Sequence, residues 1–194
     1  MRGLSGGAHG IECGLMKILS SPKRTVMTAS ILALIMIPAF LFGRSNALEV
    51  GAEAPRQSVT IETGETVDLA EAYAKGPVLV YFYPRADTPG CTKQACNLRD
   101  HFAELEEKGV KVFGVSTDSV ERQAAFKEKH NLPFSLVADT ERELGKAFGV
   151  GSAVPGFFSR QTFLVVDGKI AWRDLSASPA SQAQDALAAL GAGN

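Results

Sequence analysis

Beyond residue 47, continuous apolar runs alternate with segments in which apolar residues have helical spacing. Residues 77–83 and 110–116 are continuous runs of apolar, β-rich side chains, a pattern typical of strands buried on both faces. Between these runs, Leu98, Phe102 and Leu105 are spaced for one face of a helix. Strands that alternate with helices predict an α/β fold on a mostly parallel sheet. The predicted strands are 77–83, 110–116, 134–139 and a pair within 161–172, and the predicted helices are 69–76, 88–108, 119–130, 140–150 and 178–190.

Turn and cap residues complete this pattern. Alternating apolar and polar residues predict a β-hairpin within 58–69, ahead of the first helix. Asp167-Gly168 predicts a tight turn that makes the last two strands antiparallel. Thr140 is expected to cap the fourth helix, and Pro179 to lie near the first turn of the last helix. The expected architecture is a central mixed sheet flanked by helices, with an N-terminal hairpin.

An apolar run without charges, residues 25–43, follows Arg24 near the start of the chain. Small residues come after it and end at Ala47, as an export peptidase requires. We therefore predict an export leader over 1–47, cleavage after Ala47, and a periplasmic domain over 48–194. The alternative is a retained membrane anchor, because the run is nearly long enough to span a bilayer.

The charge of the chain restricts its partners. The full chain has a net charge of −1, and residues 48–194 carry more acidic than basic side chains, without a Lys/Arg cluster. Nucleic acid is therefore not expected as a partner. The domain is expected to be a soluble monomer. An exported domain meets oxidising conditions, so its two cysteines, Cys91 and Cys96, can form a disulfide.

Cys91 lies where a helix is predicted to begin. Thr88 fits the N-cap, Pro89 the first position and Gly90 the second, which places Cys91 in the first turn. The unpaired N–H groups and the positive end of the helix dipole stabilise a thiolate there. The position also follows a buried strand, where open α/β sheets bind their ligands. These features favour a reactive thiol over a small core residue.

Cys96 lies five residues after Cys91. On a regular helix this spacing separates the Cα atoms by roughly 8.7 Å, and a disulfide needs them within about 7 Å. The pair therefore stays reduced, or the first helical turns unwind to join it. The second case suits a cysteine that is oxidised first and resolved later. A metal site is disfavoured, because only His101 and His130 remain as further nitrogen ligands in the domain.

The segment "PRADTPGC" matches the Pro-x-x-x-Thr-x-x-Cys signature of the peroxiredoxins with Pro84, Thr88 and Cys91. The longer stretch "FYPRADTPGCTKQACNLRD" resembles the peroxiredoxin Q group, also called bacterioferritin comigratory protein. The resemblance extends from about Val50 to the C-terminus. It implies a thioredoxin-like fold, and it implies that Cys96 is the resolving cysteine. It also implies that Arg160, ahead of a Thr-Phe-Leu run, lies beside the Cys91 sulfur.

The resemblance further implies the reaction. The Cys91 thiolate, as peroxidatic cysteine, attacks hydrogen peroxide or an organic hydroperoxide and becomes a sulfenic acid. Thr88 orients the peroxide, Arg160 stabilises the developing charge, and Pro84 shields the sulfur. Cys96 then forms a disulfide with Cys91, which an external dithiol reduces. No cofactor or metal is implied. Because many members take electrons from thioredoxin in the cytosol, the leader makes an exported thioredoxin-like protein a second possible reductant.

Two other functions are alternatives for this sequence. An exported thioredoxin-like thiol–disulfide oxidoreductase would have Cys-x-x-Cys and a proline directly ahead of the Thr-Phe run. This chain has Cys-x₄-Cys, and Arg160 stands close to that run instead. A non-catalytic binding or holdase module would be favoured by loss of Thr88, Cys91 or Arg160, and all three are present. The sequence therefore favours a thiol-dependent peroxidase.

Overall fold

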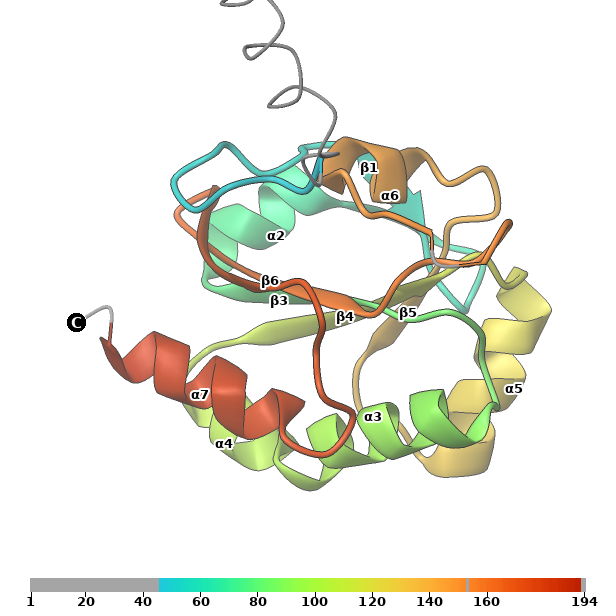
Figure 1. Cartoon of the computed structure of the whole chain (residues 1–194). Coiled ribbons are helices and arrows are strands. Elements are labelled where there is room, and N and C mark those ends of the chain that lie inside the picture. The colour runs from blue at the N-terminus through green and yellow to red at the C-terminus, as the bar shows by residue number, and fades with distance from the viewer. Residues whose placement is uncertain (1–45, 153, 193–194) are drawn as a thin grey trace, which may run out of the picture. The chain divides into compact units, whose positions relative to one another are not determined.

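The computed structural model of the chain describes residues 46–152 and 154–192 (Figure 1). Five strands form one sheet in the order β5-β4-β3-β6-β7. The strands β3, β4 and β5 are parallel, whereas β6 runs antiparallel to both β3 and β7. The predicted mixed sheet and the thioredoxin-like fold are thereby confirmed. The strands are β3 (Val78–Phe82), β4 (Lys111–Ser116), β5 (Ser135–Ala138), β6 (Gln161–Val166) and β7 (Lys169–Asp174).

Helices cover both faces of the sheet, as Figure 1 shows. One face carries α2 and α6, whose apolar side chains belong to one core. The other face carries α3, α4, α5 and α7, which contribute to a second core. Cys91 lies in this second core. The helices are α2 (Leu69–Lys75), α3 (Pro89–Asp100), α4 (Phe102–Glu107), α5 (Val120–His130), α6 (Glu143–Phe148) and α7 (Gln182–Ala192).

Residues of β3 alternate between the two cores, as side chains of a strand do. All five are buried, so the continuous apolar run is that of a central strand. Val80 and Phe82 pack in the first core, and Leu79 and Tyr81 pack in the second. The strand therefore fixes which side chains face α3.

Both predicted turns are present. The N-terminal hairpin consists of β1 (Ser58–Thr60) and β2 (Thr66–Asp68), which pair antiparallel. Asp167 and Gly168 connect β6 to β7 with φ values of 51° and 75°. Both values lie in the left-handed region that such two-residue turns require. Pro179 lies in the turn just ahead of α7, so α7 begins later than predicted.

The helix predicted over 88–108 is two helices, with a break at His101. The His101 ring atom Nδ1 lies 2.9 Å from the Asn97 carbonyl oxygen. In a regular helix that oxygen would accept the backbone N–H of His101. This N–H bonds the Arg99 carbonyl instead. The side chain thus competes with the backbone and ends α3, a local effect that apolar spacing does not reveal.

The prediction that Thr140 caps the fourth helix is wrong. The helix α6 begins later, at Glu143, and the Asp139 side chain accepts hydrogen bonds from backbone N–H groups in its first turn. The Asp139 carboxylate accepts the backbone N–H groups of Leu144 at 3.2 Å and Gly145 at 2.8 Å. A carboxylate one residue earlier therefore does what the Thr140 hydroxyl was expected to do.

The predicted leader lies outside the described residues, except for its last two positions. Ala47 is only 4% exposed, and the Arg173 guanidinium donates to its carbonyl at 3.0 Å. Leu48 donates its N–H to the Phe148 carbonyl at 3.0 Å. The folded domain therefore already includes Ala47. Among the helices of the described ranges, none combines the length and apolar character needed to span a bilayer.

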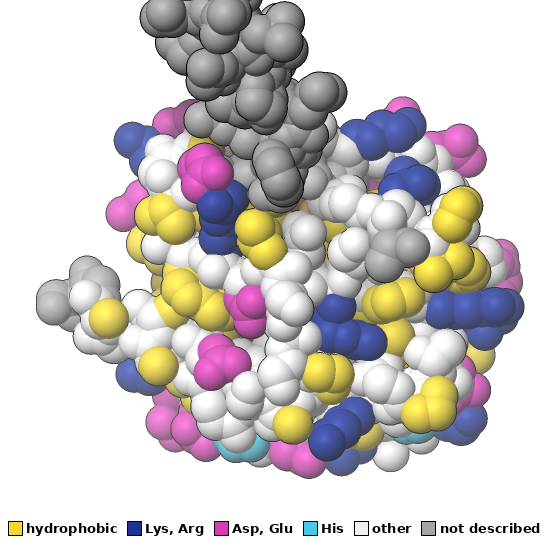
Figure 2. All heavy atoms as spheres, in the orientation of Figure 1, with side chains coloured by type: hydrophobic (Ala, Val, Ile, Leu, Met, Phe, Trp, Pro, Cys, Tyr) yellow, Lys and Arg dark blue, Asp and Glu magenta, His cyan; other side chains and the backbone are white. Residues whose placement is uncertain are grey.

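Charged side chains of both signs occupy the surface of the domain. On the face drawn in Figure 2, Lys and Arg side chains are interspersed with Asp and Glu. Several form ion pairs, such as Lys129 with Asp87 at 2.8 Å and Arg56 with Glu53 at 3.2 Å. Exposed pairs of this kind contribute about 0–1 kcal/mol each, so the stability of the fold rests on its two cores.

Candidate active site

The predicted helix start at Thr88 is confirmed. Thr88 has the extended backbone of an N-cap (φ −93°, ψ 151°), and Pro89 is the first residue of α3. The Thr88 hydroxyl does not cap the helix but donates to the Arg85 carbonyl at 3.1 Å. Cys91 therefore lies in the first turn, where backbone N–H groups lack intrahelical partners. These groups point toward any anion that forms there.

Cys91 is a free thiol that is only 2% exposed. It packs in the core beneath α3 with Tyr81, Ala95 and Leu98. Burial raises the pKa of Tyr81 well above its usual range, so its hydroxyl stays neutral. Apart from Arg160, the surroundings of the sulfur are therefore largely apolar and uncharged.

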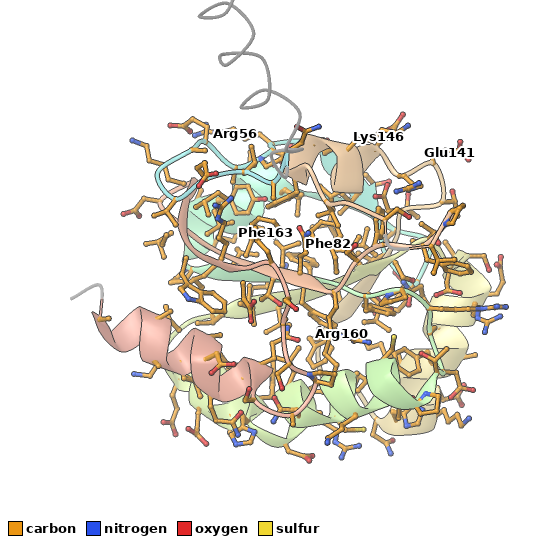
Figure 3. All side chains as sticks on the ribbon, viewed as in Figure 1. Arg56, Phe82, Glu141, Lys146, Arg160 and Phe163 are labelled. Atoms are coloured by element: carbon orange, nitrogen blue, oxygen red, sulfur yellow. The ribbon has the colours of Figure 1, made fainter. Side chains whose placement is uncertain are left out.

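Arg160 lies beside Cys91, as the family resemblance implied. Its Nη2 atom donates a hydrogen bond to the Cys91 sulfur at 3.5 Å. Arg160 directly precedes β6 and, by strand alternation, shares the face of Thr162. Thr162 pairs with Tyr81 of β3 and so faces the side that α3 covers. In Figure 3, Arg160 accordingly reaches toward α3, whereas Phe82 and Phe163 lie on the other side of the sheet.

A residue that the sequence analysis missed, Gln94, holds the arginine in place. Arg160 Nη1 donates to Gln94 Oε1, and Gln94 Nε2 donates to Gln182 Oε1 on α7. Gln94 is fully buried and Gln182 is 1% exposed. Gln94 lies three residues after Cys91, on the same helix face, so helical spacing alone could have identified it as a neighbour of the thiol. Gln182 has no such local signal, because its partner is far away in the sequence.

The loop between β3 and α3 is tied at two points. The Ala86 N–H donates to Asp118 Oδ2 at 2.7 Å. Asp87 has a φ of 62°, unusual for a residue with a side chain, and its carboxylate accepts two hydrogen bonds from Lys129 at 2.8 Å. These bonds, with one from His130, lower the pKa of Asp87. The loop is thus held in the shape that leads into the helix start.

The remaining signature residue, Pro84, is half-buried at the start of this loop. It follows Tyr83, whose N–H donates to the Val115 carbonyl at 3.0 Å. The structure therefore brings Thr88, Cys91 and Arg160 into one constellation, with Pro84 at the exit of β3.

Cys96 is a free, half-buried thiol on the same helix as Cys91. Since α3 is continuous over Pro89–Asp100, both cysteines lie on regular helix. The spacing argument thus applies, and a disulfide cannot form in this conformation.

Within the described ranges, no three His, Cys, Asp or Glu side chains group as metal ligands would.

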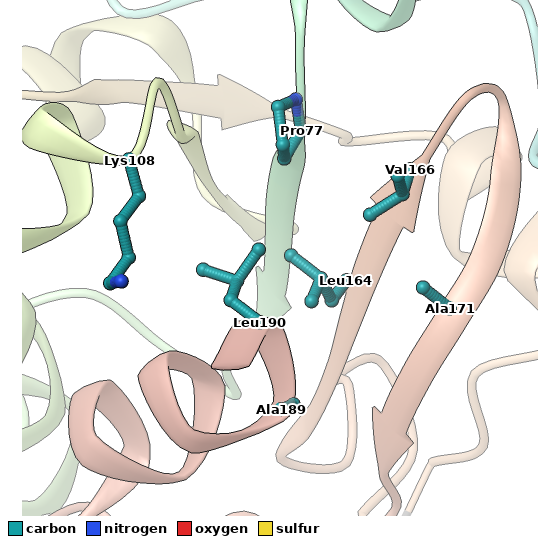
Figure 4. Close-up of a pocket in the computed structure, with 7 residues that line it drawn as sticks. All are labelled: Pro77, Lys108, Leu164, Val166, Ala171, Ala189 and Leu190. Atoms are coloured by element: carbon teal, nitrogen blue, oxygen red, sulfur yellow. The ribbon is translucent and has the colours of Figure 1, made fainter. Parts of the chain in front are cut away.

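An apolar cavity of about 340 Å³ lies at the opposite end of the sheet (Figure 4). Its lining includes Pro77 ahead of β3, Val166 at the end of β6, and Leu190 of α7. Cys91 follows the other end of β3, so this cavity is separate from the thiol.

Comparison with known proteins agrees with this geometry. Residues 50–173 match the model of the AhpC/TSA family. The Peroxiredoxin Bcp of Escherichia coli K12 is 42% identical over 132 residues, which cover 64% of this chain and 84% of the relative. Peroxiredoxin Q from the chloroplast of Gentiana triflora is 34% identical over 154 residues, covering 79% and 67%.

Solved structures give the same result. Peroxidoxin BcpB from Mycobacterium tuberculosis superimposes with a TM-score of 0.71 at 34% identity, covering 75% of this chain and 97% of that chain. Peroxiredoxin Q of Xanthomonas campestris gives a TM-score of 0.68 at 30% identity, covering 78% and 100%. The chain belongs to the peroxiredoxin family. The resemblance read from the signature is confirmed, and the family makes this peroxiredoxin a thiol peroxidase that uses a peroxide and a thiol reductant.

Gly90 tests the position of the arginine in this peroxiredoxin. A Cβ atom at Gly90 would lie 3.2 Å from Arg160 Nη2, so Gly90→Ala pushes the guanidinium by a few tenths of an ångström and weakens its bond to the sulfur, while alanine suits the helix. We expect peroxide reduction to slow by about tenfold, because a hydrogen bond from a charged group contributes roughly 1.5–3 kcal/mol. Stopped-flow kinetics measures the rate, and urea unfolding measures the stability.

Gly191→Ala is the matched control, since a Cβ there meets open space at the end of α7. It should change neither the rate nor the stability by much. An unchanged peroxide rate in Gly90→Ala would mean that the position of Arg160 does not control the reaction.

Proposed function

We propose that Cys91 is the peroxidatic cysteine of this peroxiredoxin and that Cys96 resolves its oxidised form. The observation that carries the proposal is the 3.5 Å hydrogen bond from Arg160 Nη2 to the Cys91 sulfur, in the first turn of α3. It places a permanent positive charge and unpaired N–H groups beside one thiol, as a nucleophilic cysteine requires.

In the first step, the Cys91 thiolate attacks one oxygen of the peroxide, and the O–O bond breaks. The sulfur becomes a sulfenic acid, and the other oxygen leaves as water or an alcohol after taking up the proton that the Cys91 thiol released on ionisation. Arg160 stabilises the negative charge that develops on the leaving oxygen. The Thr88 hydroxyl, half-buried at the helix start, orients the peroxide, and Pro84 limits access of water.

In the second step, α3 unwinds at its N-terminal end and Cys96 approaches the sulfenic acid. The Cys96 sulfur attacks the Cys91 sulfur, which forms a disulfide and releases one water. Unwinding is required because the intact helix holds the Cα atoms beyond the reach of a disulfide. A dithiol then reduces the disulfide by exchange.

The reductant depends on where the protein works. The predicted leader over 1–47 supports export to the periplasm, and we infer that the protein works there as a monomer, soluble or membrane-anchored. The donor there is an exported thioredoxin-like protein, whereas a cytosolic form would use thioredoxin. A bacterioferritin comigratory protein of Xanthomonas campestris, 29% identical with a TM-score of 0.68, is known for alkyl peroxide reduction. We therefore include organic hydroperoxides among the substrates, beside hydrogen peroxide.

Replacement of Cys91 tests the nucleophile. Cys91→Ser should reduce peroxide consumption to the background rate, because serine does not ionise as a thiol does. The assay follows loss of hydrogen peroxide or cumene hydroperoxide with a dithiol donor. Cys13→Ser, in the predicted leader, is the control and should retain full activity. Full activity in Cys91→Ser would sink the assignment.

Replacement of Cys96 tests the resolving step. Cys96→Ser should still react once with peroxide but accumulate Cys91 sulfenic acid, because no thiol remains to form the disulfide. Mass spectrometry after a peroxide pulse detects the added oxygen. Steady-state turnover with thioredoxin should be lost, and unchanged turnover would show that the donor reduces Cys91 directly.

A further inference from the structure

Between Cys91 and Cys96, a single described side chain forms hydrogen bonds with other elements. Among residues 92–96, within the described part of the chain, only Gln94 bonds another element through its side chain. Gln94 is fully buried. Cys96 cannot approach Cys91 without moving this segment. Unwinding therefore has to break the bonds of Gln94.

The direction of each bond follows from chemistry. A guanidinium only donates, so Gln94 must present its oxygen to Arg160 and its nitrogen to α7. Gln182 supplies the acceptor oxygen there and is 1% exposed. The Gln182 Nε2 atom is itself buried without a partner among the described residues. A buried nitrogen without a partner lowers stability. The favourable bond of the Gln182 side chain is therefore the one that its oxygen accepts from Gln94.

The second half of α3 is attached to α7 more extensively. Asn97 donates to the Ala180 carbonyl at 3.0 Å and accepts the Ala183 N–H at 2.9 Å. Further along, Gln184 Nε2 lies 2.9 Å from His101 Nε2. These contacts fix the downstream half, and α3 and α7 lie side by side at the bottom of Figure 1. In the turns ahead of this half, the described side chains that bond other elements are Gln94 and Cys91, whose sulfur accepts from Arg160.

We propose that Gln182 is a positioning residue that controls the resolving step. By holding Gln94, it keeps α3 wound and Arg160 beside Cys91, and it must release Gln94 before Cys96 can react. The inference rests on the proposed roles of Cys91 and Cys96. It concerns the rate of unwinding, on which the fate of the sulfenic acid depends.

Two reactions compete for that sulfenic acid. In the wound helix, a second peroxide molecule oxidises it to sulfinic acid and is itself reduced to water or an alcohol. In the unwound helix, Cys96 displaces water and forms the disulfide. A stronger Gln94–Gln182 bond therefore favours loss of the enzyme to sulfinic acid at high peroxide. A weaker bond favours the disulfide.

The test uses the full chain with Gln182→Met, which keeps the length of the side chain and removes the acceptor. Gln182→Leu removes the same oxygen with a different shape, so the test does not depend on one variant folding. After one equivalent of hydrogen peroxide, quenched-flow alkylation and mass spectrometry give the rate of Cys91–Cys96 disulfide formation. We expect both variants to be about three- to tenfold faster than wild type, the effect of one lost hydrogen bond. At high peroxide with dithiothreitol, the sulfinic fraction of Cys91 should fall correspondingly.

Two matched variants separate this role from general stability. Gln182→Glu retains an acceptor oxygen and should resolve no faster than wild type. Leu187→Ala weakens the packing of α7 but leaves the Gln94–Gln182 bond in place, so it should not accelerate resolution. Acceleration in Leu187→Ala equal to that in Gln182→Met would overturn the inference.

The outcomes also distinguish this inference from the proposed function. Normal disulfide formation in wild type, with unchanged rates in Gln182→Met and Gln182→Leu, would overturn the role of Gln182 alone. If wild type forms no Cys91–Cys96 disulfide, the proposed resolving step fails, and this inference fails with it.

Discussion

Antiparallel pairing of β3 with β6 is the constraint on which the active site depends. Tyr81 lies opposite Thr162, so the residue just ahead of β6 comes to the end of β3 where α3 begins. Because side chains alternate along a strand, a slip of one residue would turn Arg160 to the other face of the sheet. Register therefore decides whether the guanidinium meets the Cys91 sulfur.

Aromatic packing on the far side of the sheet reinforces this register. Phe82 of β3 and Phe163 of β6 lie in an edge-to-face arrangement, with ring centroids 6.0 Å apart. Phe148 of α6 packs against both rings, at 5.4 Å and 5.0 Å. Each such pair contributes about 0.5–1.5 kcal/mol beyond burial. The core without cysteines thus holds the strands that place Arg160, whereas α3 packs in the other core.

The proposed mechanism places two opposed requirements on the helix α3. Peroxide reduction needs it wound, because its first turn and Arg160 together surround the sulfur. Resolution needs the same turns to separate, because Cys96 is out of reach on the intact helix. The contacts are distributed accordingly: Asn97 and His101 bind the downstream half to α7, and the half that moves depends on Gln94.

The sequence predicted the sheet, both turns and the helix start at Thr88, because these follow from local apolar patterns and turn residues. The family resemblance implied that Arg160 lies beside Cys91, and the structure places it there. The break at His101 and the role of Asp139 were not predicted, since each depends on a side chain that competes with or caps the backbone. Gln182 was missed because only tertiary packing brings it to α3.

Unwinding of α3 on oxidation is the central claim, and amide hydrogen exchange tests it most directly. The full chain is compared before and after one equivalent of peroxide, with β3 as the internal reference. Exchange of the amides of residues 92–96 should become faster in the oxidised protein while β3 stays protected. Identical protection of α3 in both states would contradict the account.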